Sequence, residues 1–244
     1  MKDEIIYGLN PVMEALRGTR RAFELFVAGV ASDRRFAKML QLAKEKDVPV
    51  RQREKGDISR LCGTEHHQGV ALRVEAFAYA GVEDVLARWR ASGESGLIVV
   101  LDGVQDPHNL GALIRSAACA GAHGVIIPRD RAVGVTATVE KTSAGAVETV
   151  PVAQVANIAQ TLEELKREGF WIYGAEGKAG VSLYDQDFRG NSAVVIGGEG
   201  EGIRPLVQKR CDHLIAIPMK RGVNSLNASV AGGVILFEIV RQRI

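Results

Sequence analysis

The sequence lacks the features that mark membrane, secreted and metal-binding proteins. No apolar run approaches the roughly eighteen residues that a membrane-spanning helix needs, and the charged start Met1-Lys-Asp-Glu is not followed by a signal-type apolar region. The three cysteines, Cys62, Cys119 and Cys211, form no CxxC pair, and the five histidines form no ligand motif. We therefore expect a cytosolic protein with no membrane association and no metal site.

A strong excess of charge is also absent, because the net charge is only +2. The small positive excess lies within residues 1–75, in clusters of basic residues. Such clusters suit RNA phosphates, although a solvated surface would have the same composition. The arginines of this part that we consider as RNA contacts are Arg20, Arg21, Arg34 and Arg35.

Two α/β domains are predicted from the alternation of strand-like and helix-like segments. A chain of 244 residues, 46% of them hydrophobic, can bury the cores of two such domains. In residues 1–75, strands are expected at 23–28, 48–50 and 70–74, and helices at 10–17, 33–46 and 57–61. Residues 76–96 contain a helical stretch, 82–90, followed by Ala91-Ser-Gly-Glu-Ser-Gly, whose small and polar residues indicate a linker.

Residues 97–244 are predicted to form a mostly parallel sheet with crossover helices. Leu97-Ile-Val-Val-Leu101 is a continuous apolar run, typical of a strand buried in a parallel sheet. Further strands are expected at 124–127, 149–150, 171–175, 193–196 and 214–217, with helices such as 158–168 between most of them. Because ligands of open α/β sheets bind beyond the carboxyl ends of strands, we expect the site in the loops that follow these strands.

The last two of these strands are followed by loops of unusual composition. Gly197-Gly-Glu-Gly-Glu-Gly202 has four glycines flanking two carboxylates, which would let a ligand lie against bare backbone. In the last loop, Pro218 ends the strand, and Ser225 and Asn227 precede an apolar helix. Both are residue types that cap helices, so capping alone is the alternative to a ligand site.

The glycine-rich loop is not a phosphate loop of the common kinds. It has no Walker lysine, and G-x-G-x-x-G fails because Ile203 occupies the last glycine position. Gly198, Gly200 and Gly202 do match the G-x-G-x-G loop of Rossmann-type methyltransferases. That loop follows the first strand of its domain, whereas here only about forty residues remain.

Three stretches occur in a fixed order along the second part of the chain. They are Asp106-Pro-His-Asn-Leu-Gly-Ala-Leu-Ile-Arg115, Ile196-Gly-Gly-Glu-Gly-Glu-Gly202, and Ile217-Pro-Met219 with Ser225-Leu-Asn-Ala-Ser229. Together they resemble the motifs of the SpoU (TrmH) family of RNA ribose 2′-O-methyltransferases, most closely of its members that act on a guanosine of large-subunit ribosomal RNA. At the front, Tyr7-Gly-Leu-Asn-Pro-Val-Met-Glu-Ala-Leu16 and His67-Gln-Gly69 resemble the family's substrate-binding domain.

The resemblance implies an α/β protein of two domains. Residues 1–75 would form an L30e-like RNA substrate-binding domain, residues 76–96 a linker, and residues 97–244 a methyltransferase domain with a trefoil knot, an exception to the general absence of knots. It also implies S-adenosyl-L-methionine as cofactor, ribosomal RNA as partner and a homodimer in the cytoplasm. The alternatives are the same reaction on a transfer RNA or another ribosomal site, and a non-catalytic RNA-binding or ribosome-assembly protein.

The resemblance also implies which residues form the site. The cofactor residues would be Gly197, Gly198, Gly202, Ile217, Met219, Leu226 and Asn227, and the catalytic residues Asn109, Arg115, Glu199, Ser225 and Asn227. Because a guanidinium has a pKa above 12, we expect Arg115 to hold an RNA phosphate and polarise the ribose hydroxyl rather than to remove a proton. Glu199 is expected to orient Arg115 or to accept the N–H groups of its own loop, and Ser225 to fix its loop.

Overall fold

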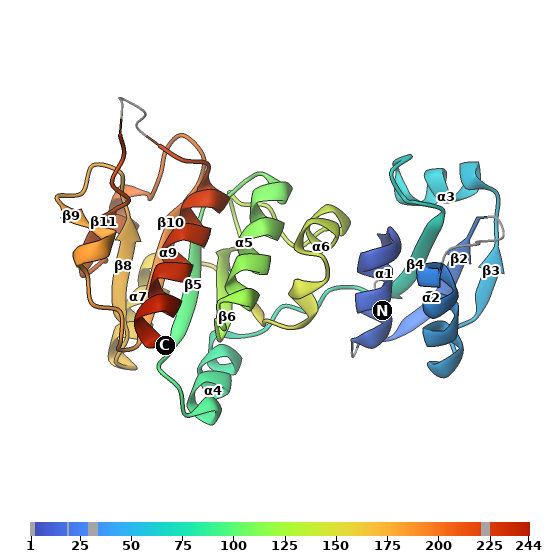
Figure 1. Cartoon of the computed structure of the whole chain (residues 1–244), viewed down its shortest axis with the longest axis horizontal. Helices are drawn as coiled ribbons and strands as arrows, with labels where there is room; N and C mark the ends of the chain where they lie inside the picture. The colour runs from blue at the N-terminus through green and yellow to red at the C-terminus, as the bar shows by residue number, and fades with distance from the viewer. Residues whose placement is uncertain (1–2, 19, 29–33, 221–224) are drawn as a thin grey trace. The chain divides into compact units, whose positions relative to one another are not determined.

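The computed structural model describes residues 3–18, 20–28, 34–220 and 225–244, apart from the side chains of Arg34 and Ala137. The chain divides into two compact units, which we treat separately (Figure 1). Unit 1 comprises Met1–Ala78 and Val135–Thr149, and unit 2 comprises Tyr79–Gly134 and Val150–Ile244. A segment from the middle of the second predicted domain thus packs with the front of the chain.

Unit 1 is built on a four-stranded mixed sheet of order β1-β4-β2-β3. β4 is antiparallel to β1 and β2, and β3 is parallel to β2. The strands are β1 (Asp3–Tyr7), β2 (Ala22–Val27), β3 (Val50–Gln52) and β4 (Val70–Glu75). The helices are α1 (Leu9–Arg17), α2 (Arg34–Glu45), α3 (Lys55–Cys62) and α6 (Ala137–Ser143), and α6 is followed by the 3-10 turn η1 (Ala146–Glu148).

The sequence of β4 explains why both faces of this sheet are covered. Side chains alternate between the faces of a strand. Val70, Leu72 and Val74 are buried in a core that includes residues of α1 and α2. Ala71 belongs to a second, smaller cluster with Ile58 of α3. Positions 70 to 72 are therefore all apolar because Val70 and Leu72 face one core and Ala71 faces the other.

Unit 2 is built on a seven-stranded sheet of order β7-β6-β5-β10-β8-β11-β9, in which all neighbouring strands are parallel. The strands are β5 (Leu97–Asp102), β6 (Gly124–Pro128), β7 (Val152–Val155), β8 (Trp171–Ala175), β9 (Val181–Ser182), β10 (Ser192–Gly197) and β11 (His213–Ala216). The helices are α4 (Val82–Ser92), α5 (Pro107–Cys119), α7 (Ile158–Arg167), α8 (Pro205–Gln208) and α9 (Ala228–Arg243), with a 3-10 turn η2 (Leu183–Asp185). The predicted α/β class with a parallel sheet is confirmed.

Helices cover both faces of this sheet. On one face, Val85 of α4 packs in a buried cluster with Ile98 of β5 and with residues of α7. On the other face, α5 and α9 lie side by side (Figure 1). Gly232 allows α9 to approach closely, because a Cβ there would overlap the Leu113 side chain and lie 2.9 Å from Cδ1 of Ile196. A larger residue at position 232 would push α9 away from the sheet.

The direction of strand addition reverses at β5. The chain runs from β5 to β6 and β7 on one side, and then crosses to β8, β10 and β11 on the other. Where the direction of strand addition reverses in this way, the loops at the carboxyl ends of two neighbouring strands diverge and leave a crevice. We call this side of the sheet the carboxyl edge, and all three family motifs lie along it.

Several predicted elements differ from those observed. α1 begins at Leu9 after Gly8, whose φ of 92° suits glycine, so Asn10 is not its cap. The strand expected at 149–150 lies at 152–155, and β1 was not expected because its charged residues obscure the alternation. The expected linker contains α4, which packs on the sheet of unit 2. The trefoil knot stays a prediction of the family resemblance.

No helix within the described ranges is both long and apolar enough to cross a membrane.

Candidate active site

Side chains from all three motif loops meet at the carboxyl edge of unit 2. Asn109 lies in the first turn of α5, Glu199 in the loop after β10, and Asn227 immediately before α9. Nδ2 of Asn109 donates to Oε1 of Glu199, and Oδ1 of Asn109 accepts from Nδ2 of Asn227 at 3.0 Å. The two bonds orient the Asn109 amide unambiguously, since its nitrogen faces a carboxylate. Asn109 therefore links the three loops, although they are distant in sequence.

Asn227 has a second role at the start of α9. Its Oδ1 accepts from the N–H groups of Ser229 at 2.9 Å and Val230 at 3.3 Å, and from the Ser229 hydroxyl at 2.6 Å. This is the N-cap geometry that the sequence raised as the alternative to a ligand site. The oxygen of the amide therefore caps the helix, while its nitrogen donates to Asn109.

Glu199 makes a contact that the sequence did not indicate. Besides the Asn109 amide, its carboxylate lies 3.5 Å from the backbone N–H of Gln105, in the loop after β5. It makes no hydrogen bond with Arg115 among the described residues. Within this chain, Glu199 thus joins the loop after β10 to Asn109 of α5 and to the loop after β5.

The glycines of the loop after β10 permit close backbone approach. A Cβ on Gly198 would overlap the carbonyl of Gly103, and a Cβ on Gly197 would overlap the backbone of Gly202. Gly200 and Gly202 have φ values of 84° and 68°, which L side chains rarely adopt. The loop thus folds back on itself and against the loop after β5, with its backbone at the carboxyl edge.

One buried residue that the sequence analysis missed, Asp102, holds both ends of this glycine loop. The carbonyl of Asp102 accepts from Gly198 N–H at 3.0 Å. Its carboxylate accepts from Arg204 N–H at 2.8 Å and Arg204 Nε at 2.7 Å, and also pairs with Nη2. Asp102 is almost fully buried, so these bonds are little weakened by water. The only signal in the sequence was a lone acidic residue that ended an apolar strand.

Apolar side chains lie exposed beside this polar network. Met219 and Leu226 are 37% and 38% exposed, and Ile217 is half-buried. Exposed apolar groups next to bare glycine backbone suit a flat, partly apolar ligand that also accepts and donates hydrogen bonds. The residues present therefore fit S-adenosyl-L-methionine, whose adenine ring has this character. Among the described residues, no cluster of His, Cys, Asp and Glu could hold a metal ion.

Arg115 is exposed and has no hydrogen bond or ion pair to any residue in the described ranges. It lies six positions after Asn109 on α5, which is about 120° around the helix from that side chain. The structure therefore does not bring Arg115 into the Asn109 network of the same chain. Ser225 is also exposed, and it makes no side-chain bond to another described residue.

Arg20 is not available to RNA, contrary to the prediction. Its side chain is only 10% exposed and is surrounded by three carboxylates of unit 1. It pairs with Glu4 of β1, with Glu140 of α6 at 2.7 Å and with Glu148 of η1 at 2.9 Å. Arg20 therefore holds the segment Val135–Thr149 against the front of the chain.

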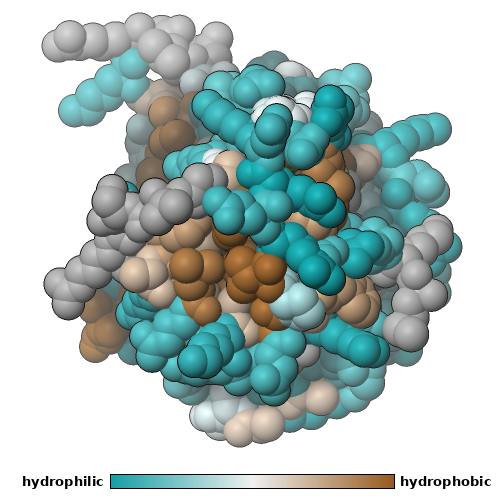
Figure 2. Space-filling view, turned by 90° about the vertical axis from the view of Figure 1, so that its right-hand side faces the viewer, coloured by the Kyte–Doolittle hydropathy of each residue, from teal (hydrophilic) through white to brown (hydrophobic). Residues whose placement is uncertain are grey.

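The other basic residues considered as RNA contacts differ in their surroundings. Arg21 is exposed, with its guanidinium 5.4 Å from the centre of the Phe23 ring. It lines a hollow of about 510 Å³ together with Lys46. Arg35 is exposed on α2, and the side chain of Arg34 lies outside the described residues. Figure 2 shows a largely hydrophilic face around a smaller hydrophobic group.

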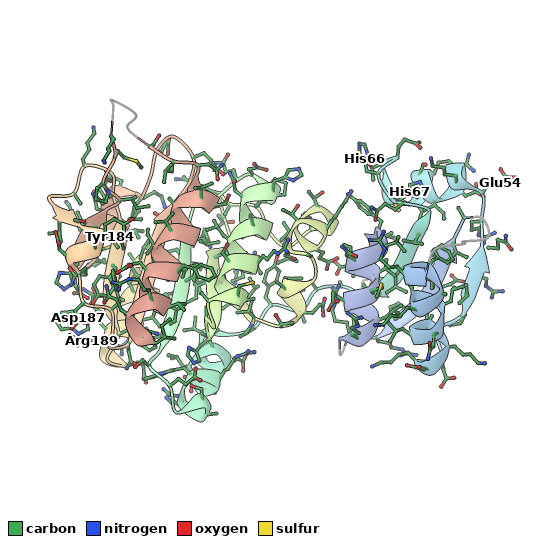
Figure 3. The ribbon with its side chains drawn as sticks, viewed as in Figure 1. Glu54, His66, His67, Tyr184, Asp187 and Arg189 are labelled. Atoms are coloured by element: carbon green, nitrogen blue, oxygen red, sulfur yellow. The ribbon has the colours of Figure 1, made fainter. Side chains whose placement is uncertain are left out.

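His67, one of two adjacent histidines labelled in Figure 3, is a structural residue. It is fully buried, its Nδ1 accepts from Gly69 N–H at 3.0 Å, and its Nε2 lies 3.0 Å from the Ser59 hydroxyl. Burial lowers the pKa of His67, which favours the neutral ring that these bonds require. It therefore fixes the turn before β4.

Comparison with known proteins agrees with this geometry. The model of the SpoU rRNA Methylase family matches residues 96–237, and that of RNA 2′-O ribose methyltransferase substrate binding matches residues 5–80. The 23S rRNA (guanosine-2′-O-)-methyltransferase RlmB of Xylella fastidiosa is 45% identical over 243 residues, which are 99% of this chain and 98% of the relative. RlmB of Ralstonia nicotianae is 44% identical over 245 residues, with 99% and 97% covered.

Solved structures give the same result. The SpoU methyltransferase AviRb from Streptomyces viridochromogenes, in complex with AdoMet, superposes with a TM-score of 0.82 at 25% identity, covering 99% of this chain and 90% of that one. The match spans both units, and the family models together cover most of the sequence. The chain belongs to the SpoU rRNA methylase family, as its three motifs predicted.

Proposed function

We propose that this protein transfers a methyl group from S-adenosyl-L-methionine to the ribose 2′-hydroxyl of a guanosine in large-subunit ribosomal RNA. The observation that carries the proposal is the network of Asn109, Glu199 and Asn227, which joins the three motif loops at the carboxyl edge of a parallel sheet. The choice of a ribosomal guanosine is supported by relatives of that name, which match this chain along nearly their whole length.

The cofactor would lie among the three loops. Backbone groups of Gly197, Ile217 and Leu226 would hold it, with the exposed side chain of Met219 beside its apolar part. When bound, S-adenosyl-L-methionine supplies a methyl group on a sulfonium sulfur. Asp102 would keep the glycine loop in the conformation that fits the cofactor, since its main-chain carbonyl fixes one end of the loop and its buried carboxylate fixes the other end through Arg204.

Arg115 would act on the RNA. The methyl acceptor is an alcohol, a poor nucleophile at neutral pH, so it must be placed in line and polarised. An exposed guanidinium with no partner among the described residues is free to bind the phosphate next to the target ribose and to stabilise the negative charge that develops on the 2′-oxygen as its proton leaves to solvent water. The arginine stays protonated in this role.

Unit 1 would provide further RNA contacts. We propose that residues 1–75 grip the RNA while residues 97–244 perform the reaction, in accord with the two matched family models. Arg21 and Arg35, both exposed, are the candidates that remain after Arg20 is excluded.

We also propose a cytoplasmic homodimer, since α9 leaves Val230 and Phe237 half exposed and a second copy would cover them.

The experiment is transfer of labelled methyl to deproteinised large-subunit rRNA from cells that lack this protein, followed by nucleoside analysis and mapping. A single labelled 2′-O-methylguanosine is expected. The Asn109→Ala variant is the control, and it should give no label because the three loops lose their common partner. Label on transfer RNA alone would refute the ribosomal target. Absence of label from all RNAs, with S-adenosyl-L-methionine still bound, would point to a partly assembled subunit as the substrate or to RNA binding as the function.

A further inference from the structure

The loop after β6 carries two arginines that no motif includes. β6 pairs with β5 in parallel, so this loop leaves the sheet beside the loop after β5, at the carboxyl edge. It contains Arg129, Asp130 and Arg131, all exposed. Neither guanidinium makes a hydrogen bond or ion pair within the part of the chain that the structure describes. The loop therefore presents two cations where the motif loops converge.

Backbone contacts place Arg131 close to the loops that we propose hold the cofactor. Val133 N–H donates to the Val104 carbonyl at 3.0 Å, and a Cβ on Gly103 would lie 3.8 Å from the Arg131 carbonyl oxygen. On its other side, Gly103 is in close contact with Gly198 of the glycine loop. The loop after β6, the loop after β5 and the glycine loop are thus packed in that order.

Arg131 is held in an unfavourable conformation. Its φ is 59°, in the left-handed region that L side chains rarely adopt, and asparagine or glycine would be easier to accommodate there. The other arginines of unit 2 that lie beside carboxylates show a different arrangement. Arg204 is paired with Asp102, and Arg189 with Asp187. A strained position that keeps an arginine without an internal partner indicates a charge directed to a ligand.

We propose that Arg129 and Arg131 bind backbone phosphates of the RNA strand that carries the target ribose, on the side of the site opposite the glycine loop. This inference rests on the proposed function and adds a substrate contact to it. Phosphate is the ligand that suits two exposed guanidinium groups best, because each can donate two parallel hydrogen bonds to it. Asp130 between them reduces the local charge to +1, so binding requires the arginines themselves rather than a general positive field.

The test compares two double variants with the same change in charge. Arg129→Ala/Arg131→Ala removes the proposed contact. Arg189→Ala/Arg210→Ala is the control, and it removes two exposed arginines at the amino ends of β10 and β11, the opposite edge of the sheet. There Arg189 lies beside Asp187 (Figure 3). The first variant should raise the Kd and KM for RNA about tenfold and reduce the slope of log K against log salt by about 1.5, since each phosphate contact contributes 0.7–0.9.

The remaining readouts separate a phosphate contact from a role in cofactor binding or in the chemical step. The kcat and the calorimetric affinity for S-adenosyl-L-methionine should stay within about twofold of the parent values. Arg129→Lys/Arg131→Lys, which keeps both charges, should restore most of the salt slope. The proposal is overturned if Arg129→Ala/Arg131→Ala binds RNA with the salt slope of the parent protein, or if Arg189→Ala/Arg210→Ala weakens RNA binding equally. It is also overturned if the Arg129→Ala/Arg131→Ala variant loses affinity for the cofactor instead of for RNA. If the parent protein methylates no RNA, the proposed function fails, whereas an unchanged slope with an active parent refutes only this contact.

Discussion

Arg115 of unit 2 and Arg20 of unit 1 have the same side chain in opposite surroundings. Arg115 is exposed on α5 and has no partner among the described residues. Arg20 is buried and lies against Glu4, Glu140 and Glu148. The comparison teaches that a basic cluster in a sequence does not by itself identify a substrate contact. An arginine can bind RNA only when the fold leaves its charge uncompensated.

The surroundings of Arg20 also contain more negative charge than one guanidinium can balance. Burial raises the pKa of Glu140 to about 8; the Arg20 cation opposes this rise, and the Glu4 and Glu148 carboxylates add to it. Burial likewise raises the pKa of Glu148. Oε2 of Glu140 accepts no hydrogen bond from any described residue. The stability that the Arg20 cluster confers therefore depends on pH.

Removing Arg115 should have the largest effect on activity and almost none on folding. Arg115→Ala is expected to lower kcat about 10³-fold, because a positioned cation that polarises the acceptor would be lost. The free energy of unfolding should change by less than about 0.5 kcal/mol, as for other exposed residues without partners. Single-turnover methyl transfer and urea denaturation measure the two quantities. A variant with normal turnover would show that Arg115 takes no part in the reaction.

Removing Arg20 should give the opposite pattern. Arg20→Met is expected to lower the free energy of unfolding by about 3 kcal/mol at pH 8, because buried carboxylates would be left without their cation. Its neighbour provides the control, since Arg21→Met changes an exposed side chain and should cost under about 0.5 kcal/mol. Denaturation in urea at pH 8 compares them. Equal stability of the two variants would contradict the structural role assigned to Arg20.

The pairing of Arg204 with Asp102 offers a third, intermediate case. Asp102→Asn should weaken S-adenosyl-L-methionine binding about tenfold, because the charge-assisted bonds that fix the Arg204 end of the glycine loop become ordinary ones. Calorimetry measures the affinity, and Asp187→Asn, at an exposed pair away from the site, serves as the control. Arg204→Gln should add little in the Asp102→Asn background, since both changes remove the same interaction. Additive losses would mean that the two residues act separately.

The smallest expected effect is on the pH dependence of stability. The folded protein holds a proton on Glu140 up to about pH 8, whereas the unfolded carboxyl releases it near its ordinary pKa of 4.5. Unfolding therefore releases a proton in this window, and stability falls as the pH rises through it. Glu140→Gln should flatten this fall by about 1 kcal/mol between pH 7 and pH 8, as followed by denaturation at several pH values. A variant with the parent pH profile would place the titration elsewhere.

Much of the fold could be predicted because local patterns were clear. The continuous apolar run of β5 and the alternating segments of unit 1 indicated the strands, and most helices began within a few residues of the expected position. α6 and its packing in unit 1 could not be foreseen. Its attachment depends on Arg20 meeting Glu140 and Glu148, which are 120 or more positions away in sequence.

The site was predictable to the extent that the motifs contain it. Asn109, Glu199 and Asn227 were identified as site residues from the motifs, but their mutual hydrogen bonds follow from the order of strands in the sheet. Arg129 and Arg131 were missed because they lie outside every motif. Nothing in their local sequence indicates that β6 pairs beside β5.

The sequence by itself determined the family, the α/β class and the polar motif residues in the loops that follow the strands, because these depend on residue type and spacing along the chain. Only the tertiary structure decided which arginine side chains are left without a carboxylate partner. Whether an arginine is neutralised depends on the carboxylates that the fold brings within a few ångströms of it, and distance in space is not encoded by distance in sequence. Arg20 and Arg115 are indistinguishable by residue type, but Arg20 is buried among carboxylates and Arg115 is exposed with no partner among the described residues.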